Sequence, residues 1–268
     1  MRAPQHHAAS GGWHPIEWGC ELVGTALLLL GGLSAVCLDF GPASPVASVV
    51  PSHYWRLLVT GVLFASTGAA VTVSPLGRRS GAHLNPAVTL AFWSRRQVHP
   101  HDLAGYTVSQ VLGALAGTEI VRLAWGSTAR AVSLGVTQPG RGLDAPQAAL
   151  VEALMTAIMI GTILVMVSSP HTARWTPFVL IPVIAILVWQ GAPYTGTSLN
   201  PARSIGPALL LPRLHDLWVY LVGPLGGAMA AAGVFSLVTD AETLTAKLYH
   251  DPRYPSTMRT ALVAGTHA

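Results

Sequence analysis

Two copies of one short motif carry the residues of this chain that could act on a small molecule. The segment GAHLNPAV begins at Gly81 and the segment GTSLNPAR begins at Gly196, so both contain Leu-Asn-Pro-Ala with a glycine four residues before the asparagine. Asparagine is among the best helix N-caps, and proline is best tolerated at the first helical position, where its missing N–H needs no partner. Each copy therefore predicts a helix that begins at Asn85 or Asn200.

Two such helix starts, brought together, would act on water and on ions. The prolines Pro86 and Pro201 are followed by the small residues Ala87 and Ala202, which allow the two helix ends to meet. Each helix would present the positive end of its dipole there, and this repels cations. If the asparagine oxygens cap backbone N–H groups, both side-chain NH₂ groups remain free to donate. Two donors to one water oxygen turn its hydrogens outward and interrupt a proton-conducting chain of waters.

Two acidic residues lie inside apolar segments that precede these motifs. ELVGTALL begins at Glu21 and EALMTAIM begins at Glu152, so in both a threonine follows the glutamate by one helical turn. Acidic residues within a membrane are functional by default, and a proton relay is one possible role. We favour a supporting role, in which the carboxylates accept N–H groups from the loops before Asn85 and Asn200.

The composition places these residues in a membrane protein. Hydrophobic residues make up 51% of the 268 residues and charged residues only 10%, with a mean hydropathy of +0.50. About a quarter of an average soluble domain is charged. Helices of about 20 residues cross a hydrocarbon core about 30 Å thick, and six apolar segments suit that length: 17–38, 55–76, 102–125, 147–168, 176–193 and 216–238. Two shorter segments, 85–95 and 200–211, rise only about 15 Å each, so they can enter the membrane but not cross it.

Charge and cysteine content exclude several classes of function. The net charge is +4 and the pI is near 9.4, but no run of basic residues occurs, so we predict no nucleic-acid partner. Lysine and arginine are enriched on the side that holds both termini, which predicts cytoplasmic termini. Cys20 and Cys37 lie at opposite ends of one apolar segment, too far apart for a disulfide. Residues 1–16 and 239–268 are expected to be a polar N-terminal segment and a polar C-terminal tail.

The two halves of the chain match each other. Each half contains three long segments and one short segment, and an odd number of spans inverts the second copy. Inverted repeats that meet at the bilayer midplane, with broken helices directed at the permeant, are a transport architecture. The sequence therefore predicts one channel-like domain over 17–238, with repeat one over about 17–125 and repeat two over about 147–238.

These residues resemble the aquaporins, or major intrinsic proteins. The resemblance rests on SGAHLNPAVT, GTSLNPARSIGPAL, the two glutamate segments, YTVSQVLGALAG and YLVGPLGGAMAA, in the family's order over about 17–238. It implies an all-α membrane protein: a right-handed bundle of six transmembrane helices plus two re-entrant half-helices, with a pore in each protomer. It also implies a homotetramer and a plasma (inner) membrane location. At His83 the resemblance implies a backbone carbonyl that lines the pore, and we predict no metal or cofactor.

The resemblance also assigns a selectivity filter. Arg203 is the third residue of its short helix, where a cation opposes the helix dipole, and in the family this arginine donates to permeating water and repels cations. Thr197 and Val188 take two further filter positions. The helix-two position falls on Phe64 if the chain holds one extra residue before the first motif, and otherwise on Leu63 or Ala65.

The departures from the family pattern bear on the substrate. Water-selective members commonly have histidine where this chain has Val188, whereas glycerol facilitators usually carry an aspartate and a basic residue where it has Ser204 and Ala208. We predict a passive water channel with some passage of small neutral solutes, and the alternative is a glycerol or small polyol facilitator. No motif joins a nucleophile to a base, so we predict no enzyme. An alternating-access transporter and a purely structural bundle fit the paired motifs less well.

Overall fold

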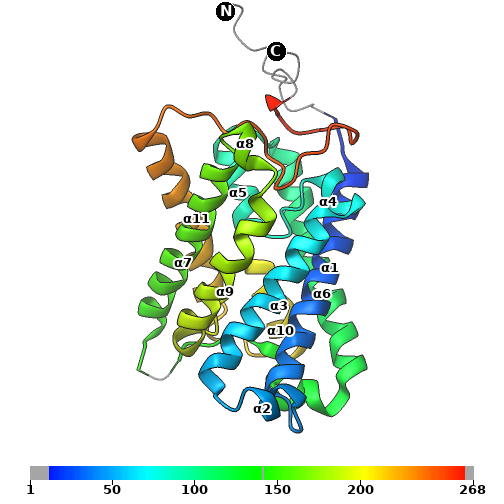
Figure 1. Cartoon of the computed structure of the whole chain (residues 1–268), viewed down its shortest axis with the longest axis vertical. Coiled ribbons are helices and arrows are strands. Elements are labelled where there is room, and N and C mark those ends of the chain that lie inside the picture. Colours follow the sequence, from blue (N-terminus) through cyan, green and yellow to red (C-terminus); the bar gives the residue numbers. More distant parts are fainter. Residues whose placement is uncertain (1–11, 141, 263–268) are drawn as a thin grey trace, which may run out of the picture.

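The structure is a computed structural model that describes residues 12–140 and 142–262. Over these residues it is helical, and the one β-bridge joins Thr245 to Thr260. The long helices form an upright bundle (Figure 1). Their bounds are α1 Pro15–Phe40, α3 His53–Val73, α6 Pro100–Ala131, α7 Ala145–Met166, α9 Thr176–Thr195 and α11 Val219–Val238. The short helices are α2 Pro45–Val49, α4 Pro75–Ser80, α5 Pro86–Ser94, α8 Pro170–Ala173, α10 Pro201–Leu210 and the 3₁₀ turn η1 Ser133–Gly135.

The observed helices lie close to the predicted segments. The largest difference is α6, which continues to Ala131, six residues beyond the predicted end at 125. Gly126 has φ 51° and ψ −115°, which are not helical torsions, so the regular part of α6 stops where the apolar pattern stops. Residues 1–11 and 263–268 of the predicted polar ends lie outside the described residues.

Within the described part of the chain, five helices are long and apolar enough to cross a membrane: α1, α3, α7, α9 and α11. The sixth predicted span corresponds to α6, which is 32 residues long but less apolar. Its sequence includes Asp102, Gln110, Glu119 and Arg122, which lower its hydropathy. Asp102 and Gln110 are buried on the side that packs against the rest of the bundle.

Glycines set the distance between the glutamate helices and their neighbours. A Cβ at Gly113 of α6 would collide with the carbonyl oxygen of Leu22 on α1, and one at Gly227 of α11 would collide with that of Ala153 on α7. Leu22 and Ala153 directly follow Glu21 and Glu152 in the chain. The two halves therefore share one close helix contact: α1 with Glu21 packs against α6, and α7 with Glu152 packs against α11.

The short helices α5 and α10 contain nine and ten residues, about 14 and 15 Å of rise. They lie inside the bundle, α5 in its upper half and α10 in its lower half (Figure 1). The two helices come from opposite ends of the bundle. Their N-termini, each with a buried Asn-Pro-Ala, meet inside it.

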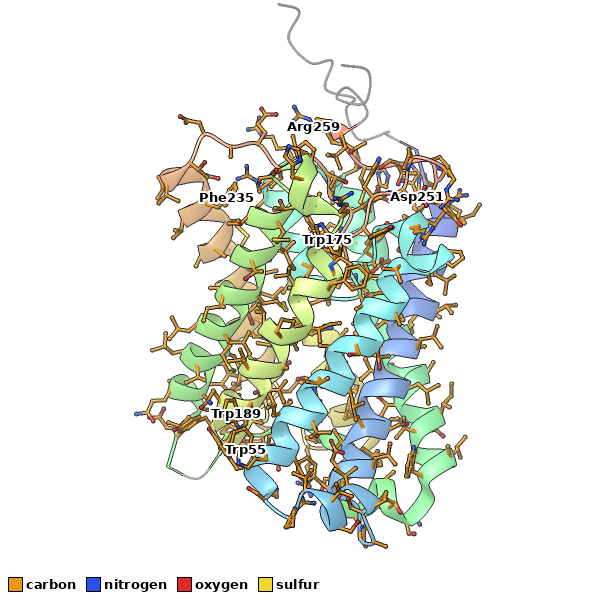
Figure 2. All side chains as sticks on the ribbon, viewed as in Figure 1. Trp55, Trp175, Trp189, Phe235, Asp251 and Arg259 are labelled. Carbon is orange, nitrogen blue, oxygen red and sulfur yellow. The ribbon has the colours of Figure 1, made fainter. Side chains whose placement is uncertain are left out.

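Tryptophans mark the two ends of the bundle. Trp55 and Trp189 lie together at the lower end and Trp175 lies near the upper end (Figure 2). Trp55 is 50% exposed and Trp175 is 51% exposed. Exposed tryptophans at both ends of an apolar bundle are typical of the membrane interfaces.

Candidate functional site

A cavity of about 480 Å³ lies along the axis of the bundle. Its wall includes His53 at the start of α3 and Thr72 near its end, and both motif asparagines. Nineteen residues of helix separate His53 from Thr72, a rise of about 28 Å. The cavity therefore extends over most of a hydrocarbon core about 30 Å thick.

Asn85 and Asn200 begin their helices as the motif predicts. The side-chain oxygen of Asn85 accepts the N–H of Ala87 at 2.8 Å, and that of Asn200 accepts the N–H groups of Ala202 at 3.0 Å and Arg203 at 3.4 Å. Pro86 and Pro201 occupy the first helical position, and Ala87 and Ala202 are fully buried.

The amide nitrogens of the two asparagines cross between the halves. Asn85 Nδ2 donates to the carbonyl oxygen of Leu199 at 2.8 Å, and Asn200 Nδ2 donates to that of Leu84 at 2.8 Å. The expectation that each whole NH₂ group stays free is therefore wrong, because one N–H of each amide holds the opposite loop. An amide nitrogen carries two N–H groups, and no acceptor for the second one of either asparagine is found among the described residues.

The loops before the asparagines have an unusual backbone conformation. Leu84 and Leu199 have φ of 52° and 57°, and Ala82 and Thr197 have φ of 55° and 49°. Non-glycine residues with positive φ are uncommon and need support from their surroundings. Both loops repeat the same pattern, so both need the same support.

Glu21 and Glu152 provide this support. Glu21 accepts the N–H groups of His83 at 3.0 Å and Leu84 at 2.6 Å, and Glu152 accepts those of Ser198 at 2.9 Å and Leu199 at 3.0 Å. Both carboxylates are fully buried. Carboxylates that accept several N–H groups are strongly bound in place.

Further supporting residues were not singled out from the sequence. Glu21 also accepts the hydroxyl of Ser80, as Glu152 accepts that of Thr195. Tyr106 donates its hydroxyl to the carbonyl of Ser80 at 2.7 Å, and Tyr220 donates to that of Thr195 at 2.8 Å. The sequence does mark these two tyrosines as equivalent, because each begins one of the similar segments YTVSQVLGALAG and YLVGPLGGAMAA.

All four predicted filter residues lie on the wall of the cavity. Phe64, Val188, Thr197 and Arg203 all line it. The Arg203 guanidinium lies 5.9 Å from the centre of the Phe64 ring and donates from Nη1 to the carbonyl oxygen of Gly135 at 2.7 Å. Arg203 is 7% exposed, so its positive charge lies beside the cavity and largely away from bulk water.

The alternatives for the helix-two position separate in the structure. Leu63 is exposed at the bundle surface, whereas Phe64 and Ala65 line the cavity. Of these two, Phe64 approaches Arg203. The free cysteines Cys20 and Cys37 are not lining residues.

His83 lines the cavity, and its buried ring is held on both nitrogens. Nδ1 lies 3.1 Å from the hydroxyl of Thr89 and Nε2 lies 2.7 Å from the carbonyl oxygen of Ala246. The ring also stacks on Phe92. It therefore joins the first motif loop to the C-terminal segment.

That C-terminal segment, residues 243–253, forms a strap across the upper end of the bundle (Figure 1). The N–H of Leu248 donates to the carbonyl oxygen of Gly81 at 3.0 Å, and the Leu248 side chain lines the cavity. Lys247 is 1% exposed and donates from Nζ to the carbonyl oxygen of Arg78 at 2.8 Å. The C-terminal tail, predicted only to be polar, therefore forms part of one mouth of the cavity.

Charged groups fix the strap. Burial lowers the pKa of Lys247 to about 8, with a further lowering from Arg79, against the opposing effects of Glu17 and Asp251. Hydrogen bonds from Arg253 hold the pKa of Asp251 well below its usual range. The same carboxylate accepts Arg78 Nη1 at 2.9 Å, which ties the strap to α4.

A model of the major intrinsic protein family matches residues 17–235. The chain belongs to the major intrinsic protein family. Glycerol uptake facilitator protein-like 6 of Lactiplantibacillus plantarum is 34% identical over 222 residues, which cover 79% of this chain and 93% of the relative. The probable aquaporin AqpM of Archaeoglobus fulgidus is 37% identical over 183 residues, which cover 66% of this chain and 74% of the relative.

A solved structure shows the same fold. The aquaglyceroporin from Plasmodium falciparum matches with a TM-score of 0.68 at 22% identity, over 84% of this chain and 96% of that chain. The predicted aquaporin-like all-α membrane fold is confirmed. Members of the major intrinsic protein family are channels and not enzymes, so this chain is an integral membrane channel for water or small solutes.

Proposed function

We propose that the chain is a passive water channel that excludes protons and ions and also passes some small neutral solutes. The observation that carries this proposal is the reciprocal bonding of Asn85 and Asn200 to each other's loop beside one continuous cavity. It supports two helix N-termini that face each other at the middle of the bundle, where their dipoles oppose a cation.

The remaining N–H groups of the two asparagines provide the water-orienting site. A water that accepts from both directs its hydrogens along the channel, away from the midpoint, and so cannot accept a further proton there. This keeps the water path and interrupts the proton path. One N–H from each amide is sufficient for this role, because the other is used to hold the opposite loop.

Phe64, Val188, Thr197 and Arg203 form the proposed selectivity filter. Arg203 supplies the positive charge that repels cations and the donors that bind a permeating oxygen. Val188 supplies an apolar surface where water-strict relatives have an imidazole. The proposed filter therefore discriminates by charge more strongly than by the size of a neutral molecule.

A polyol facilitator is the second candidate, and the filter wall favours it. Phe64 and Val188 present apolar surface on the cavity that Arg203 lines with donors, an arrangement suited to a molecule with a carbon face and a hydroxyl face. The relative from Lactiplantibacillus plantarum is named a glycerol uptake facilitator protein-like protein. One residue weighs against a polyol facilitator. Ser204 stands where glycerol facilitators usually carry an aspartate, and its uncharged hydroxyl is hydrogen-bonded to Thr137 and Ser198.

We further propose cytoplasmic termini in a plasma (inner) membrane and a homotetramer. Support for this orientation comes from the upper end of the bundle, where α4, α8 and the strap lie (Figure 1). The ends of α4, α5 and α8 and the strap carry basic residues there: Arg78, Arg79, Arg95, Arg174 and Lys247. The filter then lies toward the outer face and the strap toward the cytoplasm. The tetramer rests on what is typical of the family.

Stopped-flow light scattering on proteoliposomes tests the proposal. Water and glycerol permeabilities are measured in the same vesicles for the native protein, Val188→His and Arg203→Val, with protein-free vesicles as the baseline. We expect native water flux well above baseline and a smaller glycerol flux. Native glycerol flux equal to or above the water flux would favour the polyol facilitator.

The variants test the filter residues. Val188→His narrows the opening and adds a polar group, so the glycerol-to-water ratio should fall several-fold while water flux persists. Arg203→Val should raise that ratio and admit cations, read as dissipation of an imposed pH gradient. The lipid-facing substitution Ile186→Ala, at a residue that is 52% exposed, is the control and should leave the ratio unchanged. The same ratio in all proteins would show that selectivity is set elsewhere.

A further inference from the structure

A cluster outside the channel brings together two imidazoles and a carboxylate: the His14–His101–Asp102 cluster. His14 immediately precedes α1, and His101 and Asp102 lie in the first turn of α6. His14 Nδ1 lies 2.9 Å from both Asp102 oxygens, and His101 Nε2 lies 3.6 Å from Asp102 Oδ2. The ligand atoms all lie within 4.8 Å of one another.

Protein contacts leave one member of the cluster unsatisfied. Asp102 accepts from His14 and from Trp18 Nε1 at 2.9 Å. His101 Nε2 is buried and has no hydrogen-bond partner among the described residues, and its 3.6 Å approach to Asp102 is too long for a hydrogen bond. A buried polar atom without a hydrogen-bond partner destabilises the folded protein. The position of this nitrogen beside a carboxylate therefore suggests that both bind an atom or ion between them.

Neighbouring rings hold the cluster in place. The His101 ring stacks on Trp13 at 6.2 Å and 8°, and contacts His99 at 3.9 Å between ring centres. The Trp18 indole fixes the Asp102 carboxylate from the side of α1. In metal sites, hydrogen bonds and packing around the ligating side chains regularly hold those side chains in the orientation that binding needs.

We propose that His14, His101 and Asp102 bind one divalent transition-metal ion of the Zn²⁺ type. Two imidazole nitrogens and one carboxylate oxygen suit Zn²⁺, with a fourth position for water, whereas Mg²⁺ and Ca²⁺ prefer sites made only of oxygen. Metal–ligand bonds of about 2.0–2.2 Å separate tetrahedral ligands by about 3.4 Å, which the present separations of 2.9 and 3.6 Å bracket. The ion would replace the His14–Asp102 contact and take up the free nitrogen of His101.

The ion would join the beginning of α1 to the beginning of α6. These helices carry Glu21, Tyr106 and Gln110, which hold the first motif loop. A ligand that binds only the folded protein stabilises it by mass action. Zn²⁺ should therefore raise the melting temperature of the channel as well as bind to it.

Isothermal titration calorimetry of the full-length, untagged, chelator-treated channel in detergent tests the site. We expect one Zn²⁺ per chain and no heat from Mg²⁺ under the same conditions. Titration with Co²⁺, followed by its visible absorption, reports independently whether the ion sits among nitrogen and oxygen ligands. His6 and His7 lie outside the described residues, so every measurement is repeated in a His6→Gln/His7→Gln background.

The variants separate the cluster from other histidines. His101→Gln and Asp102→Asn should each weaken Zn²⁺ binding at least tenfold and abolish the rise in melting temperature. His171→Gln, at an exposed histidine of α8, is the matched control and should bind as the native protein does. His101→Gln removes no hydrogen bond between Nε2 and any described residue, so it should fold normally. Unchanged Zn²⁺ affinity in His101→Gln, or binding lost in the His6→Gln/His7→Gln background, would overturn the proposal.

Discussion

Thr197 is the residue of the proposed filter that chemistry can address most directly. Its side chain lines the cavity, with the hydroxyl 3.4 Å from the carbonyl oxygen of Leu187, and it lies on the positive-φ loop before Asn200. Neither Cys20 nor Cys37 lines the cavity. A mercurial therefore has no thiol in the channel wall of the native protein.

We expect native water flux to resist mercurials and the Thr197→Cys variant to be blocked. The new thiol would lie on the cavity wall, where a bound mercury atom would exclude water. Stopped-flow measurements before and after the mercurial, with reversal by an added thiol, report the block. Cys37→Ser should behave as the native protein does, and a strong block of the native channel would contradict this assignment of the wall.

Single residues also show what sequence reasoning can supply. The caps formed by Asn85 and Asn200 follow from the local preferences of asparagine and proline, which act within one turn of helix. The crossed bonds from Nδ2 to Leu199 and Leu84 do not follow, because they join atoms more than a hundred residues apart. The pairing of Phe64 with Arg203 is likewise a property of the assembled bundle.

The two motif loops are the elements that depend most on buried carboxylates. Each loop holds two non-glycine residues at positive φ and directs backbone N–H groups at one glutamate. A carboxylate accepts on both oxygens, whereas the amide of glutamine accepts on one and donates from the other atom. The substitution therefore leaves at least one loop N–H without an acceptor.

Glu152→Gln should lower the melting temperature without creating or removing any pH-dependent transport. One unsatisfied buried N–H costs about 1–3 kcal/mol, and each kcal/mol corresponds to roughly 2–4 °C for a chain of this size. Thermal unfolding in detergent measures the shift. Glu119→Gln, at a partly exposed glutamate paired with Arg122 on α6, should change the melting temperature little.

The competing role for this glutamate is a proton relay. In that case a proton-coupled current would be present in the native protein and absent in Glu152→Gln. Planar-bilayer or vesicle recordings under a proton gradient distinguish the two roles. We expect no such current in either protein.

For helices and loops, the sequence predicts their positions along the chain better than it predicts which of them contact each other. Apolar length and composition locate the spans and the half-length helices, because hydrophobic thickness is a constraint on each segment alone. The strap is missed for the opposite reason. Its residues are polar and without a helical period, and it is placed by partners such as Gly81, His83 and Arg78, which lie far away in the sequence.

The two ends of the molecule differ in the residues that line the mouth of the cavity. Toward the proposed outer face the cavity is lined by Phe40 and His53, and toward the other face by Leu248 of the strap. The strap end also carries Asp251, beside the upper helix ends, and Arg259, above them (Figure 2). The strap therefore adds charged groups to one mouth of the channel.

Lys247 makes the stability of that mouth depend on pH. Burial lowers its pKa to about 8 in the folded protein, from 10.5 in an exposed lysine. Between these two values the unfolded chain binds more protons than the folded one, so the free energy of unfolding rises with pH, by at most about 1.4 kcal/mol per pH unit. Below pH 8 the ammonium is charged in both states, and this gain is absent.

The comparison of the native protein with Lys247→Met isolates this effect. Melting temperatures in detergent are measured from pH 7 to pH 10, and the difference between the two proteins cancels the titration of all other groups. We expect the native protein to gain stability relative to Lys247→Met as the pH rises above 8, with Arg213→Met, at an exposed arginine of the opposite end, following the native curve. A difference that stays constant across this range would mean that water reaches the ammonium, and that the strap does not close over Lys247.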